Sequence, residues 1–137
     1  MDNGEGNVES LAQRLQNATN MPPEAFTDRG FRFAVNLVRF HRELSRPALD
    51  VPKALTYQML RAGTAIGANI EEARAASSRR DLAAKFSISL REARECHYWL
   101  RLIAADRPQL ADTMNDLIDE CSQLIAVLTT TVKRLRG

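Results

Sequence analysis

Residue types that point to catalysis or metal binding are scarce in this sequence of 137 residues. Its two cysteines, Cys96 and Cys121, are too few for a four-cysteine zinc site or a multi-disulfide framework. Its two histidines, His41 and His97, both lack the glutamate three positions earlier that a carboxylate-bridged di-metal bundle needs. A Gly-rich phosphate loop, His-Glu-x-x-His and Gly-x-Ser-x-Gly are also absent. We therefore expect a non-enzymatic protein with no metal or cofactor.

Long apolar runs are missing as well. No stretch approaches the ~18–20 apolar residues of a membrane span, and the first residues lack the basic-then-apolar order of a signal peptide. A content of 45% hydrophobic and 26% charged residues is typical of a globular domain. The length suits one such domain. We expect a reduced, cytoplasmic, single-domain protein that does not contact membranes.

Strand signals are nearly absent, whereas helix signals are strong. Asn-Gly and Asp-Gly turns do not occur, and the five prolines all lie outside the patterned stretches, so they mark connections. Between them, apolar residues recur at intervals of three and four, which is typical of amphipathic helices. We expect helices over about 27–45, 52–77, 81–105 and 109–135. The sequence thus predicts an all-α, up-down-up-down antiparallel four-helix bundle over residues 26–137, its first helix capped by Thr27 or Asp28.

The first 25 residues differ from the rest in charge. Four acids against Arg14 give residues 1–25 a net charge of −3, although the whole chain carries +2. We expect residues 1–25 to form an acidic, partly ordered N-terminal extension.

Small and polar residues inside the apolar pattern suggest self-association. Gly63 and Gly67 lie one turn apart in the second expected helix, where each glycine costs ~1 kcal/mol relative to alanine unless another helix approaches closely. Asn69 lies on the apolar stripe, where a single buried amide can fix oligomer state. Trp99 belongs to a helix with apolar residues on more than one side. We expect Gly63, Gly67, Asn69 and Trp99 at a subunit interface. The alternative is that the four helices bury all of them.

Arginine dominates the cations, with 16 of the 19 basic residues. Arginine forms forked contacts with phosphate, so seven cations are candidate nucleic-acid ligands: Arg61, Arg74, Arg79, Arg80, Lys85, Arg91 and Arg94. Arg79 and Arg80 are favoured because a loop position would expose them, although they could pair with neighbouring acids instead. The tryptophan and two tyrosines fall on helical stripes, so we expect no base-stacking aromatics among these cations. Binding would then be salt-sensitive and without sequence preference.

Ribonuclease activity is an alternative to binding alone. Arg91 and His97 resemble the Arg-x(4–6)-His motif of HEPN ribonucleases, which are helical and often dimeric. That resemblance implies acid–base cleavage of RNA by His97, with Arg91 holding phosphate. On a regular helix, however, a separation of six residues turns the two side chains ~120° apart. We therefore favour binding over cleavage.

Two longer motifs are more specific. Residues 57–73 contain Gln-x-x-Arg and then Ile-x-x-Asn-Ile-x-Glu, and residues 85–100 form a second motif that ends in Tyr-Trp-Leu. Together they resemble the bacterial four helix bundle protein family. This family includes proteins from intervening sequences of 23S ribosomal RNA genes and the accessory variability determinants of diversity-generating retroelements. The signature positions are Gln58, Arg61, Asn69, Glu72, Glu92, Glu95, Tyr98 and Trp99.

The resemblance implies an assembly and partners. Family members form ring-like homopentamers of four-helix bundles, and the retroelement branch binds RNA or DNA and a reverse transcriptase. It therefore implies a homopentameric accessory variability protein with these partners. A protein-interaction adaptor without nucleic-acid binding is the alternative. The acidic segment of residues 1–25 lies outside the signature.

Overall fold

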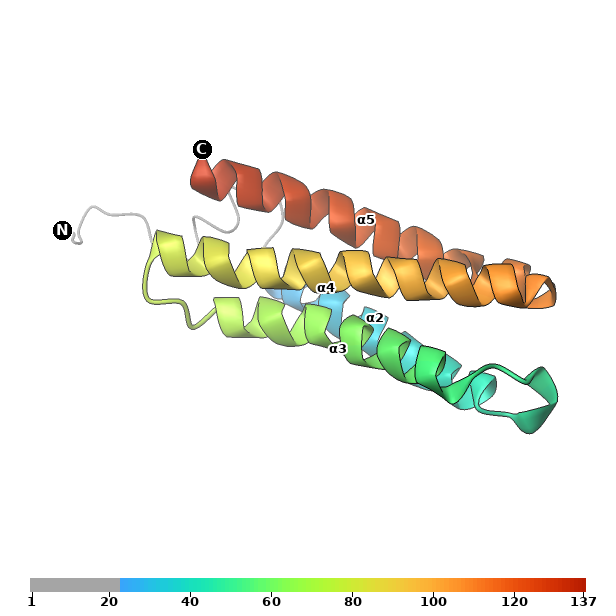
Figure 1. The fold of residues 1–137 in the computed structure, drawn as a ribbon. Coiled ribbons are helices and arrows are strands. Elements are labelled where there is room, and N and C mark those ends of the chain that lie inside the picture. The colour runs from blue at the N-terminus through green and yellow to red at the C-terminus, as the bar shows by residue number, and fades with distance from the viewer. Residues whose placement is uncertain (1–22) are drawn as a thin grey trace.

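The structure, a computed structural model, describes residues 23–137. Within this range, four long helices follow one another through short connections (Figure 1). They are α2 (Pro23–Leu44), α3 (Lys53–Ala73), α4 (Arg79–Asp106) and α5 (Ala111–Arg136), with 3-10 turns η1 (Pro47–Leu49) and η2 (Pro108–Leu110). The all-α prediction is confirmed. Most of the predicted acidic extension, residues 1–22, lies outside the described residues.

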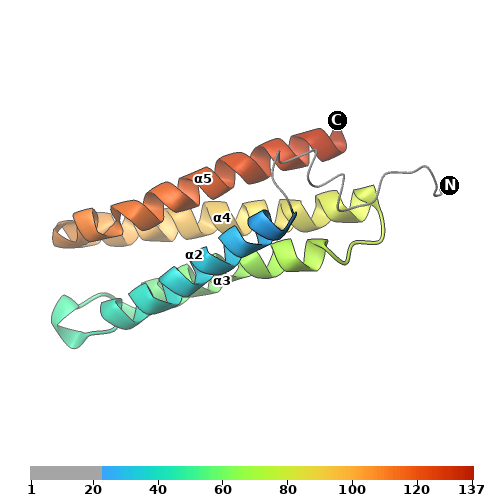
Figure 2. The same ribbon diagram turned by 180° about the vertical axis from the view of Figure 1, so that it is seen from behind.

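Successive helices run in opposite directions, as Figures 1 and 2 show from two sides. α3 packs on both α2 and α4, α4 also packs on α5, and the contact between α2 and α5 is the smallest among these neighbouring pairs. The antiparallel four-helix prediction is therefore confirmed. The bundle has four outer faces, which we name by their helix pairs: α2–α3, α3–α4, α4–α5 and α5–α2.

Two predicted helix boundaries are wrong. The first helix begins at Pro23, which suits a first turn, so neither Thr27 nor Asp28 caps it. The second helix ends at Ala73 and not near residue 77. The chain turns after Ala73, and α4 begins after Ser78, whose hydroxyl accepts the Asp81 N–H at 3.0 Å and so caps this helix.

The core consists of the predicted apolar stripes. Phe26 stacks on Phe86, with ring centroids 5.5 Å apart, and this contact fixes the start of α2 against α4. Cys96 and Cys121 are both completely buried in the core. No helix within residues 23–137 combines the length and apolarity needed to cross a membrane.

Gly63 and Gly67 allow close helix packing inside one chain. A Cβ atom added at Gly67 would lie 2.9 Å from the Gly30 carbonyl oxygen of α2, and one added at Gly63 would collide with the Leu37 side chain. Both glycines are buried. The predicted close approach therefore occurs, but with α2 of the same chain and not with another subunit.

Candidate nucleic-acid interface

Four arginines and a tyrosine form a row along the outside of α4. Because α4 is an uninterrupted helix of 28 residues, its side chains advance by about 100° per residue. At that advance, Arg80, Arg91, Arg94, Tyr98 and Arg101 fall within about 80° of arc. All five are exposed. We call the four arginines the arginine row.

The carboxylates of α4 lie away from this row and have other partners. Glu92 and Glu95 pair with Arg61 on the α3–α4 face, and Asp106 pairs with Arg107. Arg91 and Arg94, by contrast, make no ion pair within residues 23–137. The charge of the row is therefore not neutralised by its own helix.

α5 continues the positive surface. The α5 residues that follow the 3.6-residue period on the side next to the row are Asn115, Ile118, Ser122, Thr129 and Arg136, and none of them is a carboxylate. Lys133 and Arg136 are exposed in the last turn of α5. We define the basic face as the arginine row together with Lys133 and Arg136. It lies on the α4–α5 side of the bundle.

At the end where α4 begins and α5 ends, the basic face borders a hollow. It encloses about 630 Å³, and its lining consists of Arg79, Arg80, Ala83, Ala84, Leu135 and Arg136. The Arg79 guanidinium donates to the carbonyl oxygens of Leu135 at 2.8 Å and Arg134 at 2.9 Å. Arg79 thus caps the C-terminal end of α5. Arg80 and Arg136 make no ion pair within residues 23–137, so they are the cations this hollow offers.

The structure places the seven predicted phosphate ligands on different parts of the bundle. Arg80, Arg91 and Arg94 join the basic face, and Arg79 lies at its end. Arg74 is exposed just after α3, where the chain turns toward α4. Two residues belong elsewhere: on the α3–α4 face, Arg61 pairs with two glutamates, and Lys85 Nζ lies 3.8 Å from Glu72 Oε1. Arg61 and Lys85 thus each have a carboxylate partner within the chain.

Five of the eight signature residues form one network between α3 and α4. Arg61 pairs with Glu95 and, at 3.5 Å, with Glu92, while its Nε donates to Gln58 Oε1 at 3.3 Å. Trp99 Nε1 donates to Glu95 Oε2 at 3.1 Å. The Trp99 and then the Arg61 hydrogen bond lower the pKa of Glu95, and the Glu95 hydrogen bond raises the pKa of Arg61. This network holds α3 and α4 in register.

The other predicted interface residues make contacts within the chain. Asn69 is half-buried, and its Nδ2 donates to the Ala65 carbonyl at 2.8 Å, one turn back in the same helix. Trp99 is half-buried beside Glu95.

An apolar surface lies instead on the α2–α3 face. Phe31 and Tyr57 are 57% and 62% exposed. Val35, Val38 and Leu60 are half-exposed, and none of them packs against the core. We define these five residues as the apolar face. Tyr57 and Leu60 lie on α3, one of the two helices on which additional apolar residues are predicted, whereas Phe31, Val35 and Val38 lie on α2, where none are predicted.

Tyr98 corrects one expectation. It is 49% exposed, and the Arg101 guanidinium lies over its ring, 5.9 Å from the centroid. The Trp99 ring meets Tyr98 edge-on at a centroid distance of 5.1 Å. An exposed aromatic ring therefore lies among the cations, which the helical stripes did not lead us to expect. The signal was present, because Arg91, Arg94, Tyr98 and Arg101 follow a 3-4-3 spacing.

Arg91 and His97 do not share a site. Since α4 is continuous, they point about 120° apart. Arg91 is exposed, whereas His97 is half-buried, and this burial together with the nearby Arg101 lowers the pKa of His97. Among residues 23–137, no group of three or more His, Cys, Asp or Glu side chains could hold a metal ion.

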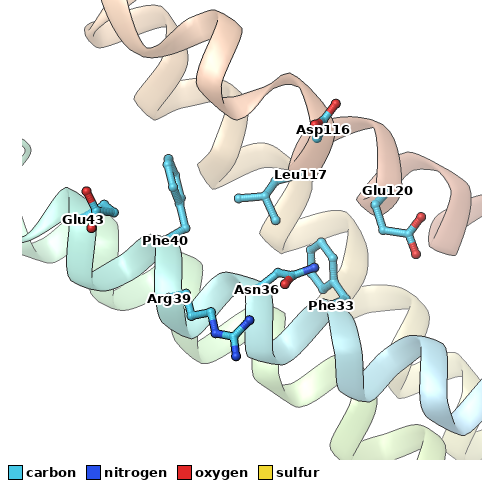
Figure 3. Close-up of a pocket in the computed structure, with 8 residues that line it drawn as sticks. All are labelled: Phe33, Asn36, Arg39, Phe40, Glu43, Asp116, Leu117 and Glu120. Carbon is cyan, nitrogen blue, oxygen red and sulfur yellow. The ribbon is translucent and has the colours of Figure 1, made fainter.

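A second hollow, of about 360 Å³, lies on the α5–α2 face (Figure 3). Phe33, Phe40 and Leu117 project into the space between the two helices, and polar side chains surround them. Beside the hollow, Arg29 Nε pairs with Glu120 Oε2 at 2.8 Å, which joins α2 to α5. The hydrogen bond to Glu120 raises the pKa of Arg29. The hollow is thus an apolar depression between α2 and α5, the two neighbouring helices with the smallest mutual contact.

Comparisons with known proteins agree with this fold. A family model described as 23S rRNA-intervening sequence protein matches residues 26–130. Among solved structures, the chain is similar to a protein of unknown function from the S23 ribosomal protein family of Bacteroides thetaiotaomicron. The two are 31% identical with a TM-score of 0.74, over 82% of this chain and 99% of the other. A search of curated proteins finds no match. The chain therefore belongs to the 23S rRNA-intervening sequence protein family.

Proposed function

We propose that this protein is a non-enzymatic, oligomeric scaffold that binds RNA or DNA through its basic face. The main observation behind this proposal is the separation of charge on α4. Exposed arginines follow one side of the helix, whereas Glu92 and Glu95 pair with Arg61 on the α3–α4 face. A surface whose arginines are not paired with carboxylates attracts a polyphosphate chain and releases its counterions.

The contacts would be made mainly to the nucleic-acid backbone. From Arg91 to Arg101 the row extends about 15 Å along α4, at 1.5 Å of rise per residue. Arginine forks bind phosphate oxygens in a bidentate manner, and such contacts carry no base information. We therefore expect salt-sensitive binding without sequence preference.

Self-association would use the apolar face. Exposed aromatic side chains such as Phe31 and Tyr57, next to half-exposed aliphatic ones, are typical of subunit contacts. The resemblance to the four helix bundle protein family supports a ring-like homopentamer. It also supports the reverse transcriptase of a diversity-generating retroelement as a partner, with this chain as its accessory variability protein.

A titration tests nucleic-acid binding. RNA and DNA oligonucleotides are titrated with protein at two salt concentrations, and affinity should fall steeply as salt rises. The double variant Arg91→Glu/Arg94→Glu should lose at least about tenfold in affinity. The matched control is Arg39→Glu/Arg42→Glu, which makes the same charge change at exposed positions of α2. Equal losses in both variants, or no wild-type binding at low salt, would contradict the proposal.

A protein-interaction adaptor is the second candidate function, and the α5–α2 hollow favours it. Its apolar floor suits the apolar side chains of a partner's amphipathic helix. Glu43, Asp116 and Glu120 outnumber Arg39 around it, so basic flanks would complement the rim. Capture of a nuclease-treated reverse transcriptase by the wild type, and its loss with Phe40→Ala, would support this function.

The ribonuclease alternative is tested separately. Purified protein is incubated with RNA without divalent metal, and we expect the RNA to stay intact. Cleavage that disappears in His97→Ala would overturn the non-enzymatic proposal.

A further inference from the structure

We propose that the basic face selects single-stranded nucleic acid, because Tyr98 offers its ring to an unstacked base. This inference rests on the proposed binding of nucleic acid by the same face, and it adds the strandedness of the ligand. The observation behind it is an exposed aromatic ring within a row of arginines.

The position of Tyr98 places cations on both sides of a stacked base. Arg94 lies one turn before Tyr98 and Arg101 one turn after it, both exposed on the same side of α4. The Arg101 guanidinium is 5.9 Å from the ring centroid, near the outer limit of ~6 Å for a cation–π contact. It therefore stays close to the ring and is free to meet a phosphate beside the stacked base.

The ring is held in place before any ligand arrives. Trp99 meets it edge-on at 5.1 Å, and the Trp99 indole donates to Glu95, which pairs with Arg61 of α3. A side chain fixed by such neighbours loses little conformational freedom on binding. The contacts among Arg61, Glu95 and Trp99 thus hold the exposed Tyr98 ring in one orientation.

A duplex cannot use this ring. The bases of a duplex are stacked on one another and present only their edges in the grooves. Their faces therefore cannot reach the Tyr98 ring, which lies close to the surface of α4. Duplex would contact the arginines alone. A single strand would use the arginines and the ring together. Base–aromatic stacking accepts every base, so the selection concerns strandedness and not sequence.

The experiment compares one oligonucleotide as a single strand and as a duplex of the same sequence. Tyr98→Ala should weaken single-strand binding by about tenfold and change duplex binding less than about twofold. Tyr98→Phe keeps the ring and should retain the wild-type preference. Gln109→Ala truncates an exposed side chain outside both the arginine row and the apolar face, and it should change neither affinity.

A second readout uses the single tryptophan. The Trp99 and Tyr98 rings form a T-shaped pair, so Trp99 emission should change when a single strand binds and stay constant when duplex binds. This measurement needs only the wild-type protein and supports the inference even where a Tyr98 variant folds poorly.

The outcomes separate the two proposals. Duplex binding as tight as single-strand binding, with no effect of Tyr98→Ala, would overturn the stacking inference and leave nucleic-acid binding intact. Failure of both ligands to bind at low salt would overturn both proposals.

Discussion

Arg61 of α3 and Glu95 of α4 form an ion pair across the α3–α4 face, although they are 34 residues apart in the sequence. Glu95 also accepts the Trp99 indole N–H, so one carboxylate joins a cation and an aromatic side chain. All three belong to the two motifs that carry the resemblance to the four helix bundle protein family. Their contacts indicate that these positions stabilise the pairing of two helices and orient the outer side of α4.

This pair predicts a pH dependence of stability. Hydrogen bonds from Trp99 and then Arg61 lower the pKa of Glu95 from its ordinary value of 4.5. The carboxylate's stabilising contribution is therefore complete above pH 4.5 and is lost as the pH falls through the lowered value. Trp99 emission should titrate with a midpoint below 4.5. In Arg61→Ala the midpoint should rise, and an unchanged midpoint would contradict the prediction.

The contact between α2 and α3 predicts the effect of adding one methyl group. Gly67→Ala should lower the free energy of unfolding by about 1–3 kcal/mol, because the new Cβ would press on the Gly30 backbone. Ala68→Gly, at the adjacent exposed position, measures the helix propensity alone, about 1 kcal/mol. Without the close contact, Gly67→Ala would stabilise by that amount. Urea unfolding of both variants gives the sign.

The Arg79 cap predicts a difference between arginine and lysine. Arg79→Lys keeps the charge but loses the fork that binds the carbonyl oxygens of Arg134 and Leu135. The last turn of α5 should then open more often, and its amide protons should exchange faster, while those in the middle of α5 stay unchanged. Hydrogen exchange monitored by mass spectrometry measures this. If the amide protons in the last turn of α5 exchange at the same rate in both proteins, the prediction is contradicted.

The buried cysteines should be inert in the folded protein. A hydrogen bond with Cys121 and burial raise the pKa of Cys96, and both side chains are fully buried. A water-soluble alkylating reagent should therefore leave both thiols unmodified in the native state and modify both in denaturant. Rapid modification of the native protein would show that α4 and α5 separate readily.

The helices could be predicted because each buried position repeats along the chain. Leu37, Ile66 and Leu124 each belong to a series of apolar residues at intervals of three and four, and all are fully buried. Burial of an apolar face is a property of local spacing, so the sequence alone suffices for it. The start of α2 was missed because it depends on Phe26 packing against Phe86, a contact between distant segments.

The candidate site was only partly predictable. Spacing indicated that Gly63 and Gly67 meet another helix, but not that this helix is α2 of the same chain. Likewise, the sequence offered Arg61 and Arg91 as equal candidates. The fold distinguishes them, because only Arg61 meets carboxylates across the α3–α4 face. Such pairing depends on how helices align in space, which no local pattern contains.

The apolar face and the basic face lie back to back, since α2–α3 and α4–α5 are opposite sides of the bundle. A subunit joined to its neighbours through the first side keeps the second one open. An assembly built this way would present several arginine rows around its perimeter. One long strand could then engage many rows at once, so avidity should grow with strand length far beyond what a lone subunit achieves.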